Sequence, residues 1–129
     1  RDWSVTGVQT CALPIWLIVD SGYAEAPSIF ERLGVPLPHD LPGDEDLPLF
    51  SAEKMRRVQA PVLLLHGTED ELIPFENAKA LFAAAPSGRR LLVPIEGAGH
   101  NNLIAVRPDL YFDAVRTFIR RYVLRMEEE

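Results

Sequence analysis

The sequence predicts an α/β fold in three layers, with about three parallel strands between flanking helices. Continuous apolar runs lie at Trp16 to Asp20, Val62 to Leu65 and Leu91 to Ile95. Runs this short are typical of strands that are buried on both faces of a parallel sheet. Segments with helical spacing of apolar residues separate or follow these runs. This alternation favours a parallel sheet with helices on both sides.

Four segments have the pattern of helices. We expect them from Ala24 to Leu33, from Ser51 to Arg57, from Pro74 to the Pro-Ser-Gly at 86–88, and from about Pro108 to about Arg125. Apolar residues recur in them at intervals of three and four, as on one face of a helix. Proline at a helix start and glycine just beyond a helix end support the boundaries.

The domain organisation is read from composition. Residues 1–15 include the string VTGVQTCALPI, which resembles the translation of a sequencing-library adapter, and we expect this segment to be non-native. Residues 16–129 are then expected to form one domain or part of one. Residues 35–50 hold four prolines and four acidic residues. Such a composition predicts an irregular surface excursion.

Charge and composition exclude several classes of function. The chain of 129 residues has a net charge of -6, which argues against binding to a nucleic-acid backbone. No apolar run approaches the ~20 residues of a membrane span, and no secretory signal is visible, which favours a cytoplasmic location. The single cysteine, Cys11, cannot form an internal disulfide. The three histidines lack metal-ligand spacing, so we expect no metal and no cofactor.

Two polar loops follow neighbouring strands. The sequence HGTEDELIP places Asp70 after the strand at 62–65, and EGAGH places His100 after the strand at 91–95. The carboxyl ends of parallel strands meet at one edge of the sheet, where ligands and chemistry collect. An aspartate that orients a histidine makes its other ring nitrogen a general base. His66, which ends a buried strand, is expected to be a hydrogen-bonded structural residue.

These two motifs, in this order, resemble the C-terminal half of the α/β-hydrolase superfamily, in its serine-aminopeptidase-like branch. The resemblance implies that Asp70 is the acid and His100 the base of a catalytic triad. It implies a truncated three-layer α/β-hydrolase fold, with residues 23–59 as a lid- or cap-like insertion. It also implies a serine hydrolase acting on a small-molecule acyl substrate of ester, amide or peptide type, without a cofactor.

The sequence departs from the family pattern at the nucleophile. The family places its serine in a G-x-S-x-G elbow, and no such motif occurs in this chain. Ser21 follows a predicted strand but has no glycine two positions before it, so a simple strand exit explains it better. We therefore expect a fragment that carries the triad acid and histidine and is inactive as given.

Two alternatives remain. The chain could be a non-catalytic binding domain that keeps a hydrolase scaffold without its nucleophile. More remotely, it could be a small independent doubly wound domain of receiver type. That fold would require an early acidic cluster after its first strand, which is not seen here, and the proline-rich insertion fits it poorly.

Overall fold

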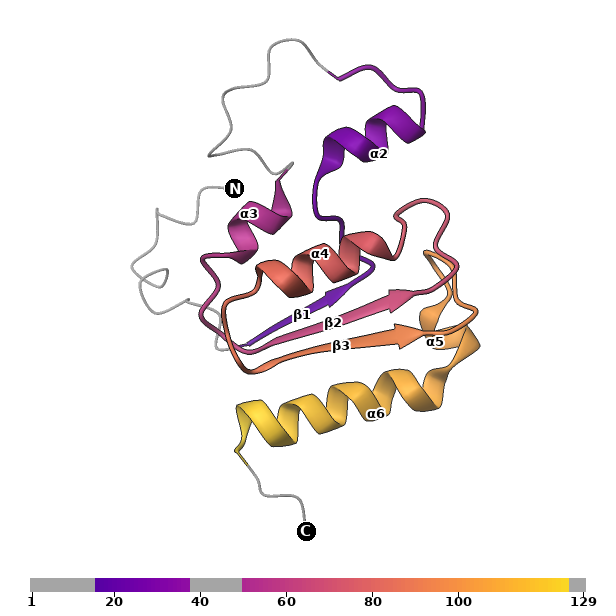
Figure 1. Ribbon diagram of the computed structural model, residues 1–129. Coiled ribbons are helices and arrows are strands. Elements are labelled where there is room, and N and C mark those ends of the chain that lie inside the picture. Colours follow the sequence, from indigo (N-terminus) through magenta and orange to yellow (C-terminus); the bar gives the residue numbers. More distant parts are fainter. Residues whose placement is uncertain (1–15, 38–49, 126–129) are drawn as a thin grey trace, which may run out of the picture.

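The computed structural model describes residues 16–37 and 50–125. In this part of the chain, three parallel strands form one sheet in the order β1-β2-β3 (Figure 1). They are β1 at Leu17–Asp20, β2 at Val62–Gly67 and β3 at Arg90–Ile95. The predicted fold class is confirmed. The expected adapter-derived segment and the middle of the proline-rich excursion lie outside the described residues.

Strand β2 is the centre of the sheet. It pairs with β1 from Leu17↔Val62 onward and with β3 from Val62↔Arg90 onward. All of its residues are buried. A strand with a neighbour on each side and a helical layer on each face needs apolar side chains throughout, which the run of valine and leucine supplies.

Helices cover both faces of the sheet (Figure 1). On one face lie α4 at Glu76–Ala84 and, packed against it, α3 at Ser51–Met55. The other face is covered by α6 at Pro108–Phe118. A further helix, α2 at Ala26–Arg32, follows β1.

The C-terminal helix differs from the expected single segment. A short helix, α5 at Leu103–Val106, precedes α6, and the chain continues beyond Phe118 as a π-helical turn, η2, at Ile119–Val123. Pro108 is well suited to the start of α6. The backbone N–H that proline lacks would have no partner within the helix at this position. The wider turn closes with a hydrogen bond from the Leu124 N–H to the Ile119 carbonyl at 2.8 Å.

Alternate residues of β2 build two hydrophobic clusters. Leu63 and Leu65 pack with Phe118 of α6, whereas Val62 and Leu64 pack with Leu81 of α4. This division follows from the two-residue period of a strand, which sends successive side chains to opposite faces. The sheet is thus fixed between two layers, and the carboxyl ends of β1, β2 and β3 form one edge.

Phe118 provides a test of this packing. Its side chain is fully buried, whereas Phe112 on the same helix is 52% exposed. We expect Phe118→Ala to lower the free energy of unfolding by about 3–5 kcal/mol, because it leaves a cavity in the core. Phe112→Ala, the control, should change it by no more than about 0.5 kcal/mol. Urea denaturation measures both, and equal losses would contradict this account of the layers.

Candidate active site

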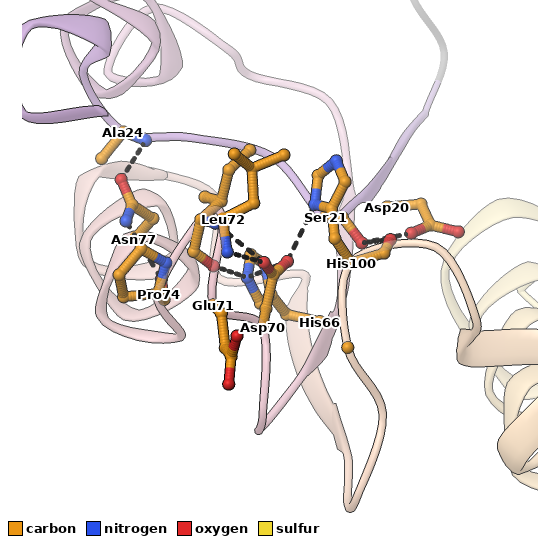
Figure 2. A network of polar contacts seen from close by, with 12 residues as sticks. Asp20, Ser21, Ala24, His66, Asp70, Glu71, Leu72, Pro74, Asn77 and His100 are labelled. Atoms are coloured by element: carbon orange, nitrogen blue, oxygen red, sulfur yellow. Dashed lines mark hydrogen bonds and ion pairs between the residues drawn. The ribbon is translucent and has the colours of Figure 1, made fainter. Parts of the chain in front are cut away.

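Asp70 and His100 meet at the edge of the sheet formed by the carboxyl ends of the strands. The His100 Nδ1 lies 2.9 Å from the Asp70 Oδ2 (Figure 2). The Asp70 side chain is fully buried, and that of His100 is 27% exposed. The sequence places these residues after β2 and β3, and the structure brings their side chains into hydrogen-bond contact.

The carboxylate of Asp70 is held by its own loop. Its Oδ1 accepts hydrogen bonds from the backbone N–H groups of Leu72 at 3.0 Å and Ile73 at 2.7 Å. These two bonds satisfy Oδ1 and turn Oδ2 toward His100. A side chain that bonds the backbone two and three residues ahead stabilises a tight local turn. The orientation of the acid is therefore set within four residues of sequence.

His66 supports the same turn from below. Its Nε2 donates a hydrogen bond to the Ile73 carbonyl at 2.7 Å and lies 3.4 Å from the Asp70 Oδ2. A carbonyl oxygen can only accept, so this nitrogen carries the proton. The ring also makes an edge contact with Phe75, with centroids 5.9 Å apart. This buried histidine has the contacts expected of a structural residue.

Backbone hydrogen bonds join the loop after β2 to the end of β3 and to the loop that follows β3. Thr68 donates its N–H to the Ile95 carbonyl at 3.2 Å, and Glu69 donates to the Ala98 carbonyl at 3.0 Å. The Thr68 hydroxyl accepts a hydrogen bond from the Gly97 N–H at 3.0 Å. These bonds bring the two loops together, and the meeting of Asp70 and His100 depends on them.

Gly67 permits this close approach. A Cβ at this position would lie 2.2 Å from the Ala98 carbonyl oxygen and 2.7 Å from the Gly99 carbonyl oxygen. Both contacts are with backbone, which cannot rotate away. The glycine of the HGTED motif is thus required because the loop after β3 lies directly against the backbone at position 67.

Two features within the loop that carries His100 stabilise its conformation. Gly97 adopts a φ of +77°, a conformation that favours glycine. The Asn102 side chain accepts a hydrogen bond from the Gly99 N–H at 2.7 Å. Asn102 therefore stabilises the loop rather than contacting the His100 ring directly.

A cavity of about 840 Å³ adjoins His100. Its size is in the range of small-molecule sites. Both polar and apolar residues line it, among them Asp20, Ser21, His100 and Asn101, with Tyr23, Ile73, Leu103 and Ile104. Figure 2 shows the second nitrogen of the His100 ring pointing away from Asp70. In the described part of the chain, no cluster of metal-binding side chains is found.

Ser21 lies beside His100 but contacts its backbone. Its hydroxyl is 2.8 Å from the Asp20 Oδ1 and 3.3 Å from the His100 carbonyl oxygen. Ser21 is buried and has a φ of +56°, which costs a non-glycine residue about 1–2 kcal/mol. The hydroxyl is engaged by oxygen acceptors, so the structure does not place it as the partner of the imidazole.

Tyr111 is the polar contact that the sequence did not reveal. Its hydroxyl donates a hydrogen bond to the Asp20 Oδ2 at 2.8 Å. Burial, together with this bond, raises the pKa of Tyr111 to about 12. Helical periodicity indicates only the buried face to which this residue belongs. A contact between residues 91 positions apart leaves no local signal.

No protein-family model matches the sequence. Among curated proteins, the α/β hydrolase domain-containing protein 17C of Xenopus tropicalis is 44% identical over 55 residues. The match covers 41% of this chain and 17% of the frog protein. The α/β hydrolase domain-containing protein aho-3 of Caenorhabditis elegans is 39% identical over 70 residues, which cover 54% of this chain and 20% of the relative.

Solved structures share the fold. A Pyrococcus furiosus esterase superposes with a TM-score of 0.64 at 16% identity, covering 84% of this chain and 44% of the esterase. The esterase domain of a Rhodothermus marinus protein gives 0.58 at 24% identity, covering 84% and 50% of the two chains. An esterase from Rhodococcus gives 0.50 at 27% identity, covering 57% and 26%.

Gly67→Ala tests the close contact between position 67 and the loop after β3. We expect it to lower the free energy of unfolding by about 1–3 kcal/mol, because the added methyl group overlaps two backbone carbonyls. Gly88→Ala is the matched control, since a Cβ there meets nothing within 4 Å and no positive φ is required. It should be neutral or slightly stabilising. Chemical denaturation compares the two variants. A Gly67→Ala protein as stable as the control would contradict the close contact at position 67.

The Tyr111 contact predicts a dependence of stability on pH. A group whose pKa is raised by folding contributes stability below its ordinary pKa, near 10, and loses it as pH rises through the folded value. The unfolding free energy of the wild type should therefore exceed that of Tyr111→Phe by a constant amount below pH 10. The difference should shrink as pH rises toward about 12. Urea titrations at several pH values measure it; a difference that grows above pH 10 would be contrary to this bond.

Proposed function

From the premise that this chain is part of an α/β-hydrolase superfamily protein, we propose that Asp70 and His100 are the acid and base of a serine hydrolase. The hydrogen bond of 2.9 Å between the buried Asp70 carboxylate and His100 Nδ1 carries the proposal. The aspartate accepts a hydrogen bond from the Nδ1 N–H, which keeps the proton on Nδ1 and leaves a lone pair on Nε2. That nitrogen is then available as a general base.

The reaction follows from this arrangement. His100 Nε2 takes the proton of a serine hydroxyl while the serine oxygen attacks the acyl carbon. Asp70 stabilises the imidazolium that forms, and His100 then returns the proton to the leaving group. The resulting acyl-serine is hydrolysed by water, which His100 activates in the same way. Asp70 remains fixed throughout, because its Oδ1 keeps two backbone hydrogen bonds.

We infer that the nucleophile is supplied from outside these 129 residues. The sequence contains no G-x-S-x-G elbow, and the hydroxyl of Ser21 is bonded to Asp20 and to a backbone carbonyl. The oxyanion-hole donors of this fold accompany the elbow and an early loop. The chain alone therefore does not catalyse acyl transfer by this route.

The substrate class is an ester, amide or peptide-type acyl compound. The Rhodococcus structure, named as an esterase and 27% identical to this chain, supports the ester. The HGTED and EGAGH motifs resemble the serine-aminopeptidase-like branch, which supports an amide or peptide-type substrate. The cavity beside His100 combines polar and apolar walls, as an acyl group with a polar reacting centre requires.

Residues 23–59 are proposed to form a cap beside this cavity. The Ala24 N–H donates to the Asn77 side chain at 3.0 Å, and Ala52 donates to the Ala24 carbonyl at 2.9 Å. Arg32 of α2 reaches the Glu71 carbonyl, next to the acid, at 2.9 Å. These contacts tie the described parts of the segment, residues 23–37 and 50–59, to α4 and to the Asp70 loop.

A second candidate is a non-catalytic binding domain on the same scaffold. The engagement of Ser21 away from the His100 ring and the missing elbow favour it. In that case the cavity would bind a ligand without turnover. Reaction with a serine-directed fluorophosphonate separates the two candidates when the complete gene product is used.

Substitution in the complete gene product tests the triad roles. We expect Asp70→Asn and His100→Gln each to lower kcat for an ester substrate by about 10⁴-fold, because tautomer control or the base is lost. Glu69→Gln is the matched control, since Glu69 is an exposed neighbour of the acid, and it should retain activity. Steady-state kinetics measure the effect. Unchanged rates in Asp70→Asn and His100→Gln, or an equal loss in Glu69→Gln, would refute the assignment.

A further inference from the structure

We propose that Ser21 is a positioning residue for His100: its buried hydroxyl anchors the His100 backbone to the end of β1. This inference deepens the proposed function and rests on it. The hydroxyl lies 3.3 Å from the His100 carbonyl oxygen, across 79 positions of sequence. Because the contact fixes the backbone of His100, it also affects the position of the imidazole ring, whose nitrogen atoms would accept and donate protons in the reaction.

The backbone of Ser21 is itself fixed. Its N–H donates to the Leu65 carbonyl of β2 at 2.9 Å, which extends the sheet pairing by one residue beyond β1. The chain then turns sharply: a Cβ at Gly22 would lie 2.4 Å from the Val19 side chain. The left-handed φ of Ser21 directs its side chain from this turn into the edge of the site. Strain of this kind persists only where the surrounding structure enforces it.

The Ser21 hydroxyl lies within hydrogen-bond distance of two acceptors, and the shorter distance is to the Asp20 carboxylate. Ser21 has one O–H donor, and both the Asp20 Oδ1 at 2.8 Å and the His100 carbonyl at 3.3 Å can only accept from it. Asp20 is held from the other side, because the Tyr111 hydroxyl donates to its Oδ2 at 2.8 Å. A chain of contacts thus runs from α6 through Asp20 and Ser21 to His100.

Tyr111 stabilises the far end of this chain. Its hydroxyl, whose pKa is raised to about 12, remains a protonated donor to Asp20 at neutral and moderately alkaline pH. Its removal should affect His100 less than removal of the Ser21 hydroxyl, because it acts through one more residue. The expected order of effects is therefore Ser21 before Tyr111.

Nuclear magnetic resonance of the chain tests the proposal without any need for activity. The probe is the His100 Nδ1 proton that lies between the ring and Asp70, followed by its rate of exchange with water in ¹⁵N-labelled protein. We expect Ser21→Ala to raise this rate by roughly three- to tenfold, which is the range for losing one typical hydrogen bond. Tyr111→Phe should raise it by a smaller factor.

Two further variants separate the hydroxyl from the backbone. Ser21→Gly removes the hydroxyl but accepts the left-handed φ without strain, and it should match Ser21→Ala. Ser28→Ala removes a hydroxyl of α2 that donates to the Glu25 carbonyl in its own turn, and it should leave the rate unchanged. If Ser21→Ala does not fold by circular dichroism, Ser21→Gly and Tyr111→Phe decide the question.

The outcomes are distinguishable. A wild-type rate in Ser21→Gly, or an equal increase in Ser28→Ala, would overturn the positioning role while leaving the Asp70–His100 pair intact. Absence of the Asp70-bound Nδ1 proton in the wild type would overturn the proposed function together with this inference. Acceleration in both Ser21 variants, with Ser28→Ala unchanged, supports it.

Discussion

The close contact between the backbone at Gly67 and the loop after β3 is the constraint on which the site depends. Parallel pairing places the ends of β2 and β3 about 4.8 Å apart but leaves the loops beyond them free to diverge. Here the Thr68 N–H bonds to the carbonyl of Ile95, the last residue of β3, and the Glu69 N–H bonds to the Ala98 carbonyl in the loop that follows. The two loops can approach this closely because position 67 has no side chain. The acid and the imidazole, thirty positions apart, meet as a consequence of backbone contacts.

The two halves of the pair are positioned by different means. Asp70 is oriented locally, since the N–H groups of Leu72 and Ile73 bind one of its oxygen atoms and leave the other for His100. His100 also depends on distant groups, because its loop, besides its own bond from Gly99 to Asn102, is held by contacts with Glu69 and Ser21. A mutation near Asp70 in sequence therefore acts on the acid directly, whereas the base responds to changes in several elements.

The sequence predicts most of the fold, because continuous apolar runs such as Val62 to Leu65 are distinctive of buried strands. Asp70 and His100 could be nominated because each follows such a strand. Short-range patterns do not contain the rest. Tyr111 belongs to the apolar face of α6, where its ring packs with the core, yet its hydroxyl reaches Asp20. An aromatic side chain with a polar tip fulfils both roles, and periodicity detects only the first.

Ser21 shows why position alone does not identify a nucleophile. It follows a buried strand, has a strained left-handed φ and lines the same cavity as His100. A nucleophile must also present its hydroxyl to the basic ring nitrogen, and this hydroxyl is bonded instead to Asp20 and to the His100 carbonyl. The strain therefore accompanies a contact with the backbone of the base. A serine beside a histidine has a different chemical role according to which atom of that histidine it touches.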